Sequence, residues 1–146
     1  MKDYELARTL ILQMIRTRMS FRQALQGILK RNHLDVTFEM LQVMNCLGHE
    51  QGVSQQVLAE KTAKDKACLT SLMNNLEKKG WVERRQDPED RRNRLVFLTP
   101  EGEKMNERMR PLIIHLYVQA GEALGKETMS LCINHLKRLD EVLNQL

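Results

Sequence analysis

Arginine residues are concentrated in one short stretch of this 146-residue sequence. The five arginines between positions 84 and 94 are Arg84, Arg85, Arg91, Arg92 and Arg94. Pro88 and Asn93 lie in the same stretch and favour a turn there. A planar guanidinium binds phosphate through two hydrogen bonds and also fits a narrow, electronegative minor groove. A polyanion is therefore the expected partner of this stretch.

Small polar side chains precede the arginines at helical spacing. They are Lys66, Thr70, Ser71, Asn74 and Asn75. Hydroxyls and amides at such positions can donate to, and accept from, base edges and phosphates. On an exposed helix each of these residues alone would only be hydrated. A polar helix face followed at once by an arginine-rich turn favours binding to double-stranded DNA.

The elements that position these residues follow from capping and periodicity. Ser54 is a predicted N-cap for a short helix over 54–61, and Asp65 for a helix ending at Lys79 before Gly80. Apolar residues of the second helix form one stripe: Leu69, Leu72, Met73 and Leu76. The runs 81–85 and 94–98 are β-like and predict a hairpin with a long polar tip. Val53 predicts a very short strand.

The flanking segments are helical. An apolar stripe predicts a first helix over about 4–30, which would be roughly 40 Å long at 1.5 Å per residue. Such a length exceeds one small core, so part of the stripe should contact something outside its own chain. Thr37 caps a second helix that ends at Gly48, and Thr99-Pro100 begins a fifth. We expect Pro111 to kink the fifth helix, Gly121 and Gly125 to stop it, and 127–146 to form a sixth.

Composition excludes several classes of protein. Hydrophobic residues make up 42% and charged residues 29%, and the few aromatic residues favour helix over sheet. No run reaches the roughly 18 apolar residues of a membrane span, and the N-terminus lacks the cleavage site of a secretory signal. Three widely spaced cysteines predict neither a disulfide scaffold nor a zinc finger, so we expect a cytoplasmic protein. The net charge is +4, and basic residues outnumber acidic ones in residues 1–31 and 61–94.

The middle of the sequence resembles the DNA-binding core of the MarR family of bacterial transcription regulators. The resemblance covers residues 53–84, including the run LEKKGWVER, and continues through DPEDRR at 87–92 and LTPEG at 98–102. It implies a mainly α fold with a small β-hairpin, a winged helix–turn–helix of six helices. It also implies a lobe over 35–100 that binds DNA, with a helical dimerisation region formed by 1–34 and 101–146. The expected function is a sequence-specific, ligand-responsive repressor acting as a homodimer on a near-palindromic operator.

The resemblance implies roles for individual residues. The predicted DNA-binding set is Ser54, Lys66, Cys68, Thr70, Ser71, Asn74, Asn75, Arg84, Arg91, Arg92 and Arg94. By position Asp65 should pair with Arg92 to steady the wing, and Asp90 should shape its tip. Relatives usually carry Ser or Thr where this sequence has Cys68. A second hypothesis for Cys68 is redox sensing, because a helix N-terminus and nearby lysines favour thiolate.

A small amphiphilic or phenolic effector is a further expectation from the family. Its pocket would be lined by Met14, Arg18, Phe21, Met40, Met44 and Met109. The same methionines could form ordinary core. Cys46 and Cys132 lie on apolar faces and are predicted to be core. No metal site or cofactor is expected, because the histidines are scattered and Glu107 with His115 is no zinc cluster.

Two other classes of function are alternatives to DNA binding. An enzyme is not expected, because the sequence has no nucleophile–base order, no glycine-rich phosphate loop and no paired carboxylates beside an apolar pocket. A winged-helix module that binds protein would share the fold. A measurement of duplex binding at several salt concentrations distinguishes the two. The affinity of a DNA-binding module falls steeply as ionic strength rises, whereas a protein-binding module has no affinity for duplex DNA.

Overall fold

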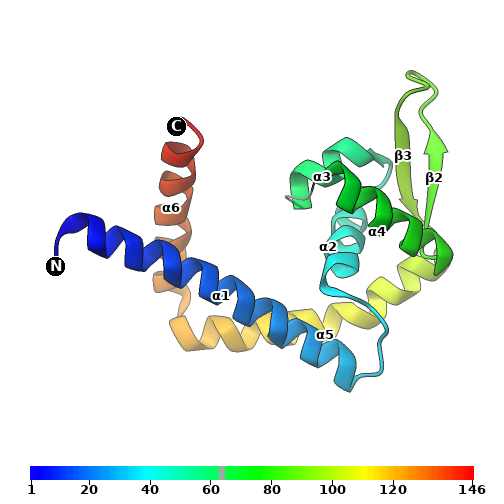
Figure 1. Ribbon diagram of the computed structural model, residues 1–146. Helices are drawn as coiled ribbons and strands as arrows, with labels where there is room; N and C mark the ends of the chain where they lie inside the picture. The colour runs from blue at the N-terminus through cyan, green and yellow to red at the C-terminus, as the bar shows by residue number, and fades with distance from the viewer. Residues whose placement is uncertain (63–64) are drawn as a thin grey trace. The chain divides into compact units, whose positions relative to one another are not determined.

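The computed structural model describes residues 1–62 and 65–146. The described residues form six helices and a β-hairpin, which confirms the prediction (Figure 1). The helices are α1 (Asp3–Arg31), α2 (Phe38–His49), α3 (Gln55–Thr62), α4 (Lys66–Lys78), α5 (Pro100–Leu124) and α6 (Lys126–Leu143). The strands are β1 (Val53–Ser54), β2 (Val82–Gln86) and β3 (Arg94–Leu98). By compactness the chain divides into two units, Met1–Arg110 and Pro111–Leu146. The predicted division into a DNA-binding lobe and a dimerisation region stays a prediction.

The three strands form one antiparallel sheet in the order β1-β3-β2. Strand β3 is central and pairs Leu98 with Val82 at one end and Arg94 with Gln86 at the other. The predicted short strand at Val53 is confirmed and pairs with Val96. Strand β1 directly precedes α3, so this pairing attaches the beginning of the helix–turn–helix to the sheet that contains the hairpin.

A single hydrophobic core holds the first unit together. Side chains from α1, α2, α3, α4 and β3 are fully buried there, among them Leu25, Met44, Leu58, Met73 and Val96. The predicted stripe of α4, from Leu69 to Leu76, is buried as expected. Burying one face of α4 leaves its polar face exposed beside the β2–β3 hairpin (Figure 1).

Side-chain caps begin the helices at the predicted positions. The Thr37 hydroxyl accepts from the Met40 N–H at 3.2 Å, and the Thr99 hydroxyl accepts from the Gly102 N–H at 3.0 Å. Ser54 accepts from the Val57 N–H at 3.2 Å. Each cap satisfies a donor that the first helical turn would otherwise leave unpaired.

Two glycines predicted as helix stops lie inside helices instead. Helix α2 runs through Gly48 to His49, and a Cβ at Gly48 would lie 2.9 Å from the Asn106 Nδ2 atom. Asn106 donates from that nitrogen to the Met44 carbonyl at 2.8 Å, so Gly48 allows α5 to approach α2. Helix α5 likewise continues past Gly121 to Leu124 and ends before Gly125, whose φ is 83°. Pro111 lies inside α5.

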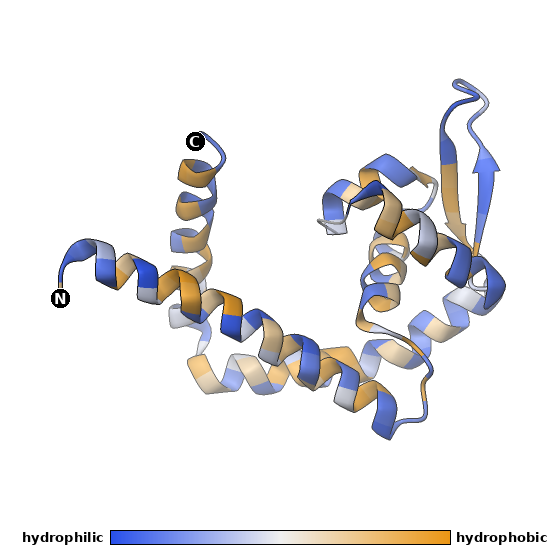
Figure 2. Ribbon diagram, in the orientation of Figure 1, coloured by the Kyte–Doolittle hydropathy of each residue, from blue (hydrophilic) through white to orange (hydrophobic). Residues whose placement is uncertain are grey.

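The terminal helices carry apolar residues that their own units do not cover. Along α1 and α6 hydrophobic and hydrophilic residues alternate (Figure 2). Leu6 and Leu10 of α1 are 61% and 52% exposed, and Ile133 and Leu136 of α6 are 53% and 40% exposed. Helix α6 has no buried residue. The prediction that Cys132 is core is wrong, because Cys132 is exposed; Cys46 is half-buried.

Candidate nucleic-acid interface

Helix α4 is oriented by its N-cap and its buried stripe. The Asp65 carboxylate accepts from the Cys68 N–H at 2.7 Å, and Gly80, with a φ of 76°, follows the last turn. Because the apolar stripe faces the core, the opposite side is exposed. We call this side the α4 polar face; it consists of Lys66, Thr70, Ser71, Asn74 and Asn75, all exposed. These residues are the predicted readers of base edges and phosphates.

The α4 polar face offers a mixture of donors and acceptors. The Thr70 hydroxyl donates to the Lys66 carbonyl at 2.9 Å, so its oxygen is left as an acceptor for a partner. Cys68 is exposed in the first turn of α4. Its N–H donates to the Asp65 carboxylate that caps the helix. Redox sensing by Cys68 stays a hypothesis.

The wing tip, defined here as residues 87–93, is braced by its own aspartates. Asp90 accepts from the Arg92 N–H at 3.0 Å, and Asp87 accepts from the Glu89 N–H at 2.9 Å. The Asp87 N–H and the Asn93 carbonyl close the loop at 3.0 Å. Aspartate side chains commonly hold turns in this way. The tip therefore has a defined shape that keeps exposed arginines at the end of the hairpin: Arg91, Arg92 and Arg94.

Arg84 differs from the other wing arginines because its side chain points inwards and is only 13% exposed. Its Nε and Nη2 atoms donate to the two Glu77 carboxylate oxygens, each at 2.8 Å. Nη2 also donates to Asn74 Oδ1 at 2.7 Å, and Nη1 donates to Gln55 Oε1 at 3.3 Å. Arg84 thus ties β2 to α4 and to the beginning of α3.

The Arg84–Glu77 contact perturbs both ionisation equilibria. Hydrogen bonds from Arg84 hold the pKa of the Glu77 carboxyl below its usual value, while the same bonds raise the pKa of Arg84. Both groups are charged near neutral pH, and the pair is bidentate, which is the strong geometry for arginine and carboxylate. Sequence reasoning did not single out Glu77 or Gln55. The available signal for Glu77 was its position three residues after Asn74 on the same helix.

The predicted pair between Asp65 and Arg92 is not formed among the described residues. Asp65 uses its carboxylate to cap α4, and Arg92 extends from the wing tip, where its backbone is held by Asp90. The wing is steadied instead by its own turn and by Arg84. Asp65 and Arg92 therefore have different structural roles and do not interact with each other.

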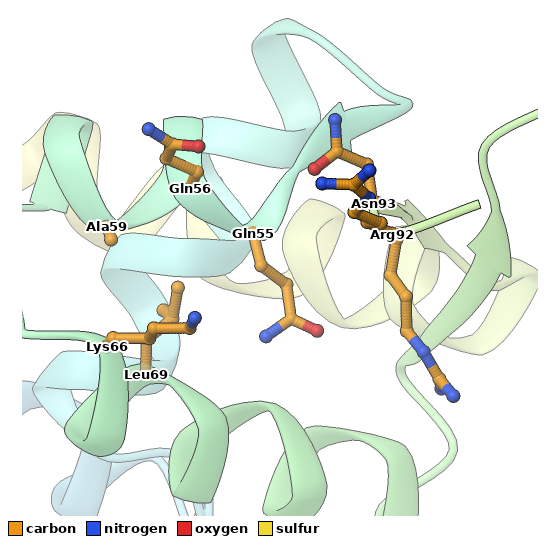
Figure 3. Close-up of a pocket in the computed structure, with 8 residues that line it drawn as sticks. Gln55, Gln56, Ala59, Lys66, Leu69, Arg92 and Asn93 are labelled. Carbon is orange, nitrogen blue, oxygen red and sulfur yellow. The ribbon is translucent and has the colours of Figure 1, made fainter. Parts of the chain in front are cut away.

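A cleft of about 550 Å³ lies between the β2–β3 hairpin on one side and α3 and α4 on the other. It is lined by Gln55, Gln56, Ala59, Lys66, Leu69, Arg92, Asn93 and Arg94. Gln55 lies between the α4 side chains and those of the wing (Figure 3). Three cations and several amides therefore surround a space open to solvent, and this charge favours a phosphate group or another anion. Ser54, also predicted to bind DNA, is half-buried and acts as the α3 cap.

The residues predicted to line an effector pocket divide by burial. Met40, Met44 and Met109 are buried in the core, while Met14 and Phe21 are half-buried and Arg18 is exposed. The Phe21 ring meets Phe38 edge-on, with centroids 6.2 Å apart. This arrangement fits the core interpretation of the methionines, and the pocket stays a prediction.

Neither a cluster of metal ligands nor a membrane-spanning helix occurs among the described residues. Within residues 1–62 and 65–146, no group of three or more histidine, cysteine, aspartate or glutamate side chains is placed to hold a metal ion. None of the described helices has the length and hydropathy needed to cross a bilayer.

Comparison with known families identifies the central part of the chain. Residues 36–93 match the model of the MarR family. The transcriptional regulator HosA of Escherichia coli O111:H- is 38% identical over 71 residues, which cover 49% of this chain and 53% of HosA. The chain thus spans about half the length of this curated relative. HosA is a transcriptional regulator.

Two solved structures extend the likeness to nearly the whole chain. NadR in complex with 4-hydroxyphenylacetate is 27% identical with a TM-score of 0.75, covering 88% of this chain and 89% of NadR. A mutant of E. coli MarR complexed with operator DNA has a TM-score of 0.82 at 22% identity, covering 95% of this chain and 99% of that one. The second likeness concerns the fold alone. It confirms the predicted winged helix–turn–helix.

Proposed function

We propose that this chain, in which residues 36–93 match the model of the MarR family, is a transcriptional regulator that binds double-stranded DNA in a sequence-specific manner. The observation that carries the proposal is the α4 polar face lying beside a hairpin that exposes three arginines at and next to its tip. A helix of this kind fits a major groove about 12 Å wide, and a basic loop next to it can follow the phosphates.

The two parts of the interface have different tasks. Arg91, Arg92 and Arg94 supply affinity that depends on salt and little on sequence, because they meet the charged backbone. The α4 polar face supplies discrimination among sequences, because amides and hydroxyls meet base edges. Lys66 lines the cleft between the two parts and contributes to phosphate binding there.

We propose that the protein acts as a homodimer. Support comes from the exposed apolar residues of α1 and of α6, which a second copy would cover. Two copies related by a two-fold axis would present two α4 helices to half-sites about one helical turn apart. The expected operator is therefore near-palindromic.

We further propose a repressor that a small phenolic or amphiphilic acid releases from DNA. Support comes from NadR, whose structure holds 4-hydroxyphenylacetate. An effector releases DNA if it binds better to a spacing of the α4 helices that does not match the half-sites. The exposed Arg18 is the cation of the predicted pocket that would meet a carboxylate.

The test starts with selection of bound sites from random duplexes by the purified protein. We expect a near-palindromic motif, and we expect log K for the selected duplex to fall linearly with log salt concentration. Absence of duplex affinity even in dilute buffer would contradict the proposal and favour a winged-helix module that binds protein. Release by 4-hydroxyphenylacetate, with Arg18→Ala as the matched variant, tests the effector separately.

A further inference from the structure

The Arg84 guanidinium constrains the amides around it because it can only donate hydrogen bonds. Its Nε and Nη2 atoms donate to the two oxygens of the Glu77 carboxylate, and this bidentate pair fixes the plane of the group. The remaining Nη2 hydrogen points to Asn74 at 2.7 Å. An Nη1 hydrogen points to Gln55 at 3.3 Å.

The Asn74 amide therefore has one allowed orientation. Its oxygen must face Arg84, because turning the NH2 group towards the guanidinium would set two donors against each other. With Oδ1 engaged, Nδ2 is the end of the amide directed away from Arg84. Asn74 is exposed on the α4 polar face, so a partner there meets a hydrogen-bond donor. The same argument turns the Gln55 oxygen towards Arg84 and its NH2 group away.

We propose that Arg84 is a specificity-positioning residue, which fixes the Asn74 amide so that Nδ2 donates to an acceptor on a base edge. This inference rests on the proposed binding to duplex DNA. Guanine presents two acceptors in the major groove, O6 and N7, and thymine presents O4. Cytosine presents a donor there. Adenine presents its N7 acceptor beside the N6 donor group, and asparagine pairs with both only when its amide oxygen accepts from N6. Because Arg84 holds that oxygen, guanine, which has acceptors at both positions, is favoured over adenine.

The first test compares Arg84→Met with Arg85→Met in the full-length chain. Arg85 is the adjacent residue of β2; it pairs with Glu83 and lies over the Phe97 ring, 4.3 Å from the ring centroid, without contacting Asn74. Both variants lose one positive charge and keep an unbranched side chain. We expect both to bind less tightly, and only Arg84→Met to lose base preference.

The readout is competition among duplexes that differ at one base pair. To identify this base pair, the wild-type protein and Asn74→Ala are compared on the site that the wild-type protein selects. The pair is the position at which Asn74→Ala no longer shows a base preference. The wild-type protein should prefer guanine or thymine over adenine and cytosine there by about fivefold or more, the worth of one hydrogen bond. Arg84→Met should bring the adenine and guanine duplexes to within about twofold, and Arg85→Met should keep the wild-type ratio.

Asn74→Asp is the second variant, in case Arg84→Met does not fold. Aspartate keeps the shape and the contact with Arg84 but presents an acceptor to DNA. We expect its preference at the same pair to move towards cytosine or adenine. The proposal is overturned if the wild-type protein prefers cytosine or adenine there, or if Arg84→Met or Asn74→Asp folds and keeps the wild-type preference. If the wild-type protein binds no duplex at all, the proposed function is overturned together with this inference. If it binds duplexes but shows the wrong base preference, only this inference is overturned.

Discussion

Gly102 is a residue whose type is dictated by a neighbouring carbonyl group. Helix α5 begins at Pro100, and the Thr99 N–H donates to the Trp81 carbonyl at 3.0 Å. A Cβ at Gly102 would lie 2.0 Å from that carbonyl oxygen and 2.9 Å from its carbon. Both atoms belong to the backbone and cannot turn aside. The glycine of the LTPEG motif is thus required for close contact between α5 and the base of the wing.

Replacing this glycine should destabilise the protein. We expect Gly102→Ala to lower the free energy of unfolding by about 3 kcal/mol, at the upper end for overpacking, because backbone must move. Urea unfolding followed by circular dichroism measures the change. Glu107→Ala, at an exposed position of the same helix, is the control and should stay within about 0.5 kcal/mol of wild type. Equal stability of the two variants would contradict the close contact.

Glu77 makes stability depend on pH through its pair with Arg84. Its pKa is lower in the folded chain than the usual value of about 4.3, so the stabilisation is complete above that value and is lost as the pH falls through the lowered one. We expect Glu77→Gln to cost about 1 kcal/mol at pH 7 and progressively less below pH 4. Urea unfolding at several pH values measures this difference.

The control for Glu77 is Glu101→Gln. Glu101 pairs with Lys104 at 3.5 Å, and both side chains are about 70% exposed. Such a surface pair contributes little, so its removal should have almost no effect at any pH. A cost of Glu77→Gln that is the same at pH 3.5 and pH 7 would show that the carboxylate charge is not what Arg84 stabilises.

At the scale of elements, the wing and α4 should fail in different ways. Arg91→Ala and Arg92→Ala should each weaken binding to the selected duplex and to random duplexes by similar factors. Each should also reduce the slope of log K against log salt by about 0.9, the value for one phosphate contact. Asn74→Ala should instead reduce the difference between selected and random duplexes. Fluorescence anisotropy at several salt concentrations measures both, and equal losses on both duplexes for all three variants would contradict this division.

The elements themselves could be predicted from the sequence because local signals specify them. Thr37, Ser54, Asp65 and Thr99 cap the helices that they were expected to cap. Local signals in the sequence do not specify the direction of a side chain whose hydrogen-bond partners lie in other helices and strands. Arg84 was grouped with the exposed arginines, yet partners from α3 and α4 turn it inwards. Gly48 was misjudged for the same reason, because Asn106 lies 58 positions away in sequence and next to it in the fold.

At the scale of the whole molecule, the apolar stripes of the terminal helices are the feature that one chain leaves incomplete. The periodicity of residues 4–30 predicted a helix longer than its core, and α1 buries Leu25 and Leu29 while Leu6 and Leu10 stay exposed. Helix α6 shows the same imbalance, with Leu136 and Leu143 exposed. Exposed apolar surface on this scale favours association with another copy.

A charge in the α6 stripe should therefore separate the proposed dimer. We expect Ile133→Glu to sediment as a monomer at concentrations where the wild-type chain is a dimer, because a buried unpaired carboxylate opposes association. Its affinity for the selected duplex should fall by about 100-fold or more, since the second half-site no longer adds its effective concentration. Asn134→Glu adds the same charge at the next exposed position and should stay dimeric. A monomeric wild-type chain that still binds the near-palindrome tightly would contradict the two-fold arrangement, and a dimeric Ile133→Glu would move the interface away from this stripe.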